Sequence, residues 1–346
     1  MRVGIVFHEK YLHHYLGPGH PESPERLRKI LESLNKVNDE NIIFFKPKPA
    51  LEEDILKVHT KDYLTSIKSM SKIGGILDPD TPVPKETYEI ARLSSGGAIE
   101  AGRLVCEKIV DASFALIRPP GHHAGKDFGG GFCYLNNTAI QIRYLQANKK
   151  VKKVAILDWD AHHGNGTQDI FYDDDSVLYF STHQFPFYPF TGDFNEIGKD
   201  KGKGFNVNVP LDVGTSGKDF EYIVKEIFIP IVKEFKPDLI TVSAGYDAYF
   251  LDPLTSLNFS VTTYANVTKL LKETAKKICG GKVSFILEGG YHLIGLSHSV
   301  LATVLTLLDS KRIKEPYLPP EQKISREIKE RVKKLKKILN EYWNVF

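Results

Sequence analysis

The chain has 346 residues, of which 42% are hydrophobic and 26% charged, and its formal net charge at pH 7 is +3. This is an ordinary globular composition whose charge gives no reason to expect nucleic acid or an anionic membrane as a partner. Three cysteines without a CxxC pair exclude a disulfide framework and a cysteine-based zinc finger. Twelve histidines contrast with them, and six stand as adjacent pairs: His13/His14, His122/His123 and His162/His163.

Short apolar runs predict the strands of a parallel sheet. Residues 1–7 form the first run, which is too short for a signal sequence, and others lie at 112–117, 154–158, 176–181, 238–243 and 283–288. None alternates polar with apolar residues, as expected for strands covered on both faces. Helical stretches occur at 84–110, 135–148, 217–235, 260–278 and 291–309. The alternation predicts one three-layer α/β domain.

The final segment, residues 311–346, differs from residues 1–310 in charge. It holds 11 Lys and Arg against 5 Asp and Glu, which leaves the rest of the chain at −3. Its apolar residues at helical spacing predict a basic amphipathic helix that packs on the domain formed by residues 1–310: Ile324, Ile328, Val332, Leu335, Leu339 and Tyr342. The alternative is a basic surface that binds an acidic partner or nucleic acid.

No stretch approaches the roughly 18 uninterrupted apolar residues of a membrane span. We therefore expect a cytoplasmic protein without a membrane partner, and nucleic acid is not expected either. The sequence leaves the oligomeric state open.

Two carboxylates and an imidazole follow the apolar run 154–157. If that strand continued, its period of two would place Asp158, Asp160 and His162 on one side, at the carboxyl edge where parallel sheets bind ligands. Adjacent buried acids need a compensating cation, and a helix cap would account for only one of them. The pattern predicts a divalent metal.

A further acid, Asp247, follows the run 238–243, after a glycine that permits a sharp exit from the strand. Asp160, His162 and Asp247 would form a site of three protein ligands. Catalytic zinc uses such a set and keeps its fourth position for water or substrate.

The loop 118–125, Arg-Pro-Pro-Gly-His-His-Ala-Gly, also follows an apolar run and presents His122 and His123. Histidine exchanges protons near neutral pH, and each ring needs a partner on its far nitrogen, for which Asp158 and Asn165 are candidates. An isolated histidine is more often a core residue. A pair in a Gly/Pro loop opposite a metal cluster favours proton transfer instead.

Gly289 and Gly290 end the last predicted strand, and Tyr291 emerges behind them. Its phenol could donate to a developing oxyanion. The alternative is a half-buried aromatic residue at the start of a helix.

Taken in order, five motifs resemble the histone deacetylase superfamily, which includes acetoin-utilisation proteins and acetylpolyamine amidohydrolases. They are RPPGHHA (118–124), GGGFCYLNN (129–137), LDWDAHHGNGTQ (157–168), SAGYDA (243–248) with Asp252-Pro253, and LEGGY (287–291). The resemblance runs from His20 to about residue 308. It implies an arginase-like α/β/α fold with a central parallel sheet of eight strands, and zinc-dependent hydrolysis of an N-acetyl amide.

The resemblance also implies roles for particular residues. Asp160, His162 and Asp247 match the ligands of one zinc ion, and potassium is implied near Asp158, Asp160, His162 and Ser181. Asp158 is the orienting partner of His122, and Asn165 is that of His123, which acts first as general base and then as general acid. Class I enzymes have an aspartate at the position of Asn165, so His123 should be less basic here. The implied substrate-binding residues are Asp80 at the rim, Gly131, the channel walls Phe132 and Tyr188, and Leu254.

These roles predict a mechanism in which zinc binds the amide carbonyl and lowers the pKa of a water towards about 7. His123 would take the proton of that water, Tyr291 would stabilise the oxyanion, and the leaving amine would receive the proton. Acetylated protein lysine is the preferred substrate, because Leu254 offers a second cation no acidic partner. A small acetylated amine, as in acetylpolyamine amidohydrolases, is the alternative.

Two other functions fit these residues less well. A binuclear manganese hydrolase of the arginase type would need more bridging carboxylates than Asp247 and Asp252 supply. A non-catalytic acyl-lysine-binding protein would have no use for a proton shuttle beside an open metal position.

Overall fold

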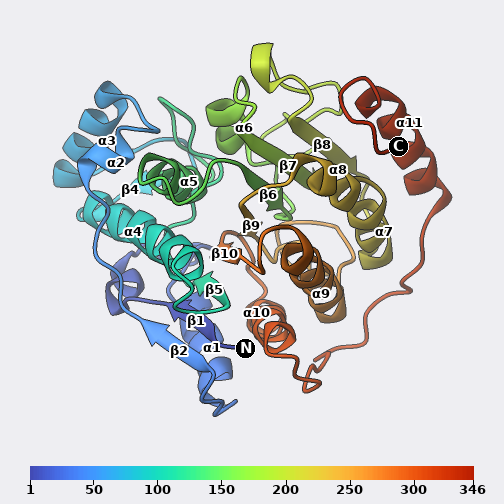
Figure 1. Cartoon of the computed structure of the whole chain (residues 1–346). Coiled ribbons are helices and arrows are strands. Elements are labelled where there is room, and N and C mark those ends of the chain that lie inside the picture. Colours follow the sequence, from blue (N-terminus) through green and yellow to red (C-terminus); the bar gives the residue numbers. More distant parts are fainter.

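Eight parallel strands form one sheet in the computed structural model, which describes all residues from Met1 to Phe346 (Figure 1). Their order across the sheet is β2-β1-β5-β10-β9-β6-β7-β8. The strands are β1 (Val3–Val6), β2 (Ile42–Phe45), β5 (Ala112–Ala115), β6 (Val154–Asp158), β7 (Val177–Gln184), β8 (Asn206–Leu211), β9 (Leu239–Ala244) and β10 (Val283–Leu287). A separate antiparallel pair, β3 (Gly75–Ile76) and β4 (Pro82–Val83), lies outside this sheet.

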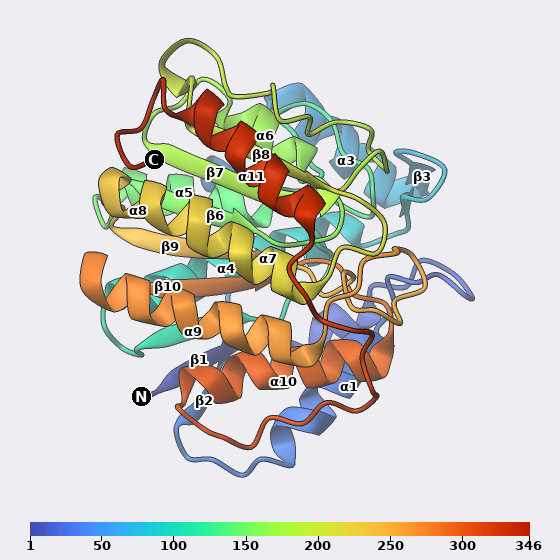
Figure 2. The same ribbon diagram turned by 90° about the vertical axis from the view of Figure 1, so that its right-hand side faces the viewer.

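Helices cover both faces of the sheet, which gives the three layers expected (Figures 1 and 2). One face carries α2 (Glu52–Ile55), α3 (Lys61–Ile73), α4 (Thr87–Cys106), α5 (Asn137–Ala147) and α6 (Asn165–Phe171). The other carries α1 (Glu25–Asn35), α7 (Gly217–Ile223), α8 (Ile229–Phe235), α9 (Val261–Ile278) and α10 (Leu293–Leu307). The predicted α/β/α architecture with an eight-stranded parallel sheet is confirmed.

The residue patterns alone missed two of the eight strands. β2 and β8 are the two edge strands. Strand β8 alternates polar and apolar residues (NVNVPL), and strand β2 is only partly buried. A search for uniformly apolar runs misses the alternating strand β8, whereas β2 is apolar throughout (IIFF) but only four residues long.

Segment 217–235 is not the one regular helix predicted. A π-helical turn at Val224–Phe228 separates α7 from α8. The other predicted helices begin and end within a few residues of their predicted limits, where caps such as Asn136 and Ser260 satisfy the first free N–H groups.

The C-terminal segment contains α11 (Arg326–Leu339), which lies along α7 and the π-helical turn (Figure 2). Its buried side chains belong to the same hydrophobic cluster as the residues of the sheet: Ile328, Val332, Leu335 and Leu339. None of the helices, α11 included, has both the length and the apolar character required to cross a bilayer.

Candidate functional site

Four neighbouring strands in the middle of the sheet, β5, β10, β9 and β6, position the site. Parallel strands end at the same edge, so the segments that follow them meet there although they are far apart in sequence. The segment after β5 carries His122 and His123, the one after β6 carries Asp160 and His162, the one after β9 carries Asp247, and Tyr291 follows β10.

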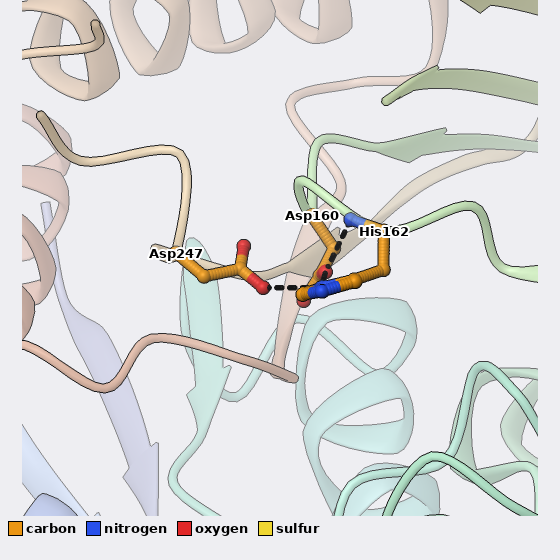
Figure 3. A group of neighbouring side chains, drawn as sticks. All are labelled: Asp160, His162 and Asp247. Carbon is orange, nitrogen blue, oxygen red and sulfur yellow. Dashed lines mark hydrogen bonds and ion pairs between the residues drawn. The ribbon is translucent and has the colours of Figure 1, made fainter. Parts of the chain in front are cut away.

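The three candidate metal ligands come together at this edge (Figure 3). Their ligand atoms all lie within 4.8 Å of one another. His162 Nδ1 lies 2.8 Å from Asp247 Oδ2 and 3.2 Å from Asp160 Oδ1. Burial alone would lower the pKa of His162, but the two carboxylates outweigh it and raise the pKa to about 10. The two carboxylates therefore favour a positively charged group or ion at this position.

Backbone groups hold the two carboxylates from behind. The amide of Gly289 donates to Asp160 Oδ2 at 2.8 Å, and the amide of Ala161 donates to Asp247 Oδ1 at 2.8 Å. Glycine is required at position 289, because an added Cβ would lie 2.6 Å from both Asp160 Oδ2 and Asp247 Oδ2. Two carboxylate oxygens, one imidazole nitrogen and this close-packed backing fit a divalent metal such as zinc.

Asp158 is not part of this cluster, contrary to the prediction that Asp158, Asp160 and His162 share one side of a continuing strand. Strand β6 ends at Asp158, and residues 159–163 form bends and turns. The Asp158 carboxylate instead lies 3.1 Å from His122 Nδ1 and accepts a hydrogen bond from Tyr179 Oη at 3.0 Å.

His122 and His123 differ in protonation. Burial alone would lower the pKa of His122, but the charges of Asp160 and Asp158 outweigh it and raise the pKa to about 10. Burial, followed by the charge of His122, lowers the pKa of His123 well below its usual range. His123 Nδ1 lies 2.8 Å from Asn165 Oδ1 and donates to it, since an amide oxygen can only accept. That hydrogen bond leaves Nε2 of a neutral His123 free to accept a proton.

Tyr291 is held by its backbone and its ring. Its amide donates to Asp252 Oδ2 at 2.7 Å, and the Arg26 guanidinium lies 5.0 Å from the centre of its ring. Burial raises the pKa of the Tyr291 phenol well above its usual value, although Arg26 acts in the opposite direction. The phenol is therefore a hydrogen-bond donor at neutral pH.

A cavity of about 330 Å³ opens over these groups. His122, His123, His162 and Tyr291 line it, and so do all five residues predicted to contact substrate: Asp80, Gly131, Phe132, Tyr188 and Leu254. Ser181, predicted near a potassium ion, pairs with Asp158 between β7 and β6, and its hydroxyl contacts His183 Nδ1 at 2.8 Å.

Sequence reasoning missed a buried ion pair beneath the site. Glu22 binds Arg118 through two hydrogen bonds and Arg26 through one at 3.1 Å, and all three side chains are fully buried. Arg26 in turn donates to the backbone carbonyls of Glu288 and Gly290, next to Tyr291. The four-residue spacing of Glu22 and Arg26 was the available signal, although Glu22 precedes α1, which begins at Glu25.

One member of the pair His13/His14, to which the sequence assigned no role, contacts the same network. His14 is buried 3.8 Å from Glu22, whereas His13 is exposed. His20, Pro21, Asp78 and Phe187 also line the cavity without having been assigned a role there.

Comparisons with known proteins agree with this geometry. A family model described as "Histone deacetylase domain" matches residues 20–307. The "Probable deacetylase" of Archaeoglobus fulgidus is 43% identical over 359 residues, a match that covers 100% of both chains. The "Histone deacetylase-like amidohydrolase" of Pseudomonas aeruginosa is 38% identical, with 84% of this chain and 82% of that protein covered.

Longer and structurally solved relatives match as well. "Histone deacetylase HDA1" of Saccharomyces cerevisiae is 36% identical over 96% of this chain but only 50% of its own length. The crystal structure of the HDA15 HD domain superposes with a TM-score of 0.90 at 33% identity and covers 99% of this chain and 95% of that one.

Proposed function

The chain belongs to the histone deacetylase family, and we propose that it is a zinc-dependent deacetylase that hydrolyses the acetyl amide of lysine side chains. One observation carries the proposal. One cavity is lined by His162 of the cluster Asp160, His162 and Asp247, by the neutral imidazole of His123 and by the protonated phenol of Tyr291.

Zinc held by Asp160, His162 and Asp247 would supply Lewis-acid activation of the amide carbonyl and of a water molecule. His123 takes the proton of the attacking water at Nε2, because Asn165 occupies its Nδ1. The phenol of Tyr291 donates a hydrogen bond to the oxygen on which negative charge develops and keeps its proton. His123 then returns a proton to the leaving amine, and acetate and a free amine result.

The walls of the cavity support a slender aliphatic stem as the part of the substrate that enters. Phe132 and Tyr188 present aromatic surface, and Asp80 is an exposed carboxylate at the opening. Leu254, which contributes an apolar side chain to the lining, gives no acidic partner for a second amine. These features favour an acetyl-lysine peptide over an acetylated polyamine.

One metal ion per chain is proposed in preference to two. Asp160, His162 and Asp247 are the one group of three or more potential ligands that the structure brings together. Two equivalents of bound manganese with ureohydrolase activity would refute this assignment.

The decisive experiment measures acetate release from an acetyl-lysine peptide by zinc-loaded protein and its variants. We expect His123→Ala and Tyr291→Phe to lower kcat about 100-fold or more, since each removes a group that acts on the transition state. Zinc should stay near one per chain in both variants. Tyr222→Phe on α7, where the tyrosine is only partly buried, is the matched control and should keep full activity.

Full activity of either site variant at full zinc loading would refute the assignment. Hydrolysis of acetylputrescine in preference to the peptide would instead favour an acetylpolyamine amidohydrolase. Peptide binding by the wild-type protein without acetate release would favour a non-catalytic acyl-lysine-binding protein.

A further inference from the structure

Two consecutive residues on the cavity wall have left-handed backbones. Gly131 has a φ of 52° and Phe132 a φ of 69°. Left-handed geometry is uncommon for a phenylalanine and persists only where surrounding groups enforce it. The position is also crowded, because a Cβ on Gly131 would lie 2.5 Å from His123 Cδ2 and 3.0 Å from Tyr188. Some group must therefore hold this backbone against the general base.

The turn between β3 and β4 supplies that group. Asp78 Oδ2 accepts a hydrogen bond from the Gly131 amide at 2.9 Å, and Thr81 Oγ1 accepts one from the Phe132 amide at 2.9 Å. Both consecutive N–H groups are thus held by side chains of one turn. Thr81 is fully buried, and its own amide donates to the Asp78 carbonyl at 3.0 Å.

Asp78 also reaches the opposite wall of the cavity. Tyr188 Oη lies 3.4 Å from the same Oδ2 atom that holds Gly131. The Tyr188 ring stands edge-on to His123, with 5.2 Å between ring centres. One carboxylate oxygen therefore connects the Phe132 wall with the Tyr188 wall.

A role confined to its own turn would account for only one of the two oxygens of the Asp78 carboxylate. Its Oδ1 atom accepts the Asp80 amide at 3.0 Å, the ordinary bond by which an aspartate closes its own turn. Its Oδ2 atom makes no bond within the turn and is used only by Gly131 and Tyr188. This division of the two oxygens distinguishes a turn that shapes the channel from a turn that only stabilises itself.

We propose that Asp78 and Thr81 are positioning residues that set the width of the substrate channel by fixing Gly131–Phe132 and, through Tyr188, the facing wall. The proposal rests on the proposed function, in which the lysine stem passes between Phe132 and Tyr188. The walls contact that stem in the ground state and in the transition state alike. Loss of the positioning bonds should therefore raise KM and leave kcat nearly unchanged.

Thr81→Val tests the proposal because it removes the hydroxyl and keeps the shape of the side chain. We expect KM for an acetyl-lysine peptide to rise about tenfold, the effect of one buried hydrogen bond, with kcat changed less than about threefold. Thr81→Ser, which restores a hydroxyl, should recover most of the loss. Thr65→Val, the same change on the exposed face of α3, is the matched control.

Asp78 is tested in the same way. Asp78→Ala should raise KM at least as much as Thr81→Val, whereas Asp78→Asn should recover only part of the loss, because its single amide oxygen can accept from Gly131 or from Asp80 but its NH2 group faces the other amide as a second donor. If Asp78 acts partly through the facing wall, Tyr188→Phe should raise KM by a smaller factor in the Asp78→Ala background than in the wild-type protein. An equal rise of KM in the two backgrounds would refute the link between the walls.

A readout independent of turnover is hydrogen exchange of the backbone segment 129–133, followed by mass spectrometry. Exchange of this segment should be about tenfold faster in Thr81→Val than in Thr65→Val, since one restraining bond is lost. Unchanged exchange, or a fall in kcat at constant KM, would overturn the proposal. If wild-type protein fails to hydrolyse the peptide, the proposed function fails, while the exchange measurement still decides whether Thr81 holds the wall.

Discussion

His59 makes the stability of this protein depend on pH at a point next to the catalytic loop. Its ring is buried, with 1% exposure, and both ring nitrogens bind backbone. Nδ1 donates to the Gly125 carbonyl at 2.8 Å, and Nε2 accepts from the Asn136 amide at 2.9 Å. The second bond requires an unprotonated Nε2, so His59 must be neutral for both bonds to form. It thereby joins the end of the His122–His123 loop to Asn136, the N-cap residue of α5.

The size of the effect follows from the pKa in the two states. Burial lowers the pKa of His59 to about 4, although the bond to Gly125 acts in the opposite direction, and the unfolded chain titrates near 6.5. As the pH falls below 6.5, the unfolded state binds a proton that the folded state does not. Stability is therefore complete above about pH 6.5 and falls as the pH drops towards 4, by about 2 kcal/mol at pH 5 and about 3 kcal/mol in full.

Urea unfolding of wild-type protein and His59→Gln at pH 7.5 and pH 5 isolates this contribution, because other titrating groups cancel in the comparison. The stability advantage of the wild type should shrink by about 2 kcal/mol between the two pH values. His13→Gln is the control, since His13 is exposed and its replacement should leave the pH dependence unchanged. A wild-type advantage that is the same at both pH values would refute the reasoning.

Two further substitutions test other parts of the site. Gly289→Ala should weaken zinc binding at least about tenfold in competition with a chromophoric chelator, because the added methyl group would press on Asp160 and Asp247; undiminished affinity would show that the close backing is dispensable. Glu22→Gln should lower the free energy of unfolding by about 3–5 kcal/mol in a denaturant titration, since it leaves the Arg118 guanidinium buried without its counter-charge. A loss below about 1 kcal/mol would contradict the importance of that ion pair.

The chemistry of the site was readable from the sequence because it depends on short motifs at the ends of apolar strands. Asp160, His162 and Asp247 were identified from residue type and position, and the structure brings their ligand atoms together. The alternation argument grouped Asp158 with the metal ligands because it assumed that β6 continues, whereas Asp158 lies 3.1 Å from Nδ1 of His122, the histidine it was also expected to orient. Where a strand ends depends on the turn that follows it, and a period of two does not reveal that point.

Edge strands and long-range polar contacts could not be predicted from local residue patterns, for a related reason. β8 alternates polar and apolar residues, and β2 is an apolar run of only four residues, so pairing with a neighbouring strand decides that both are strands. The pairing of Glu22 with Arg118 joins residues 96 positions apart. No local pattern of spacing marks such a contact.

By itself the sequence determined the alternation of strands and helices, the metal-ligand set and the candidates for proton transfer, because these follow from side-chain chemistry and local periodicity. Only the tertiary structure decided which distant side chains support these groups. It placed Glu22 against Arg118, and Asp78 and Thr81 against the channel wall. The physical reason is that hydrogen bonds form within about 3 Å, and the order of strands across the sheet decides which distant segments approach that closely.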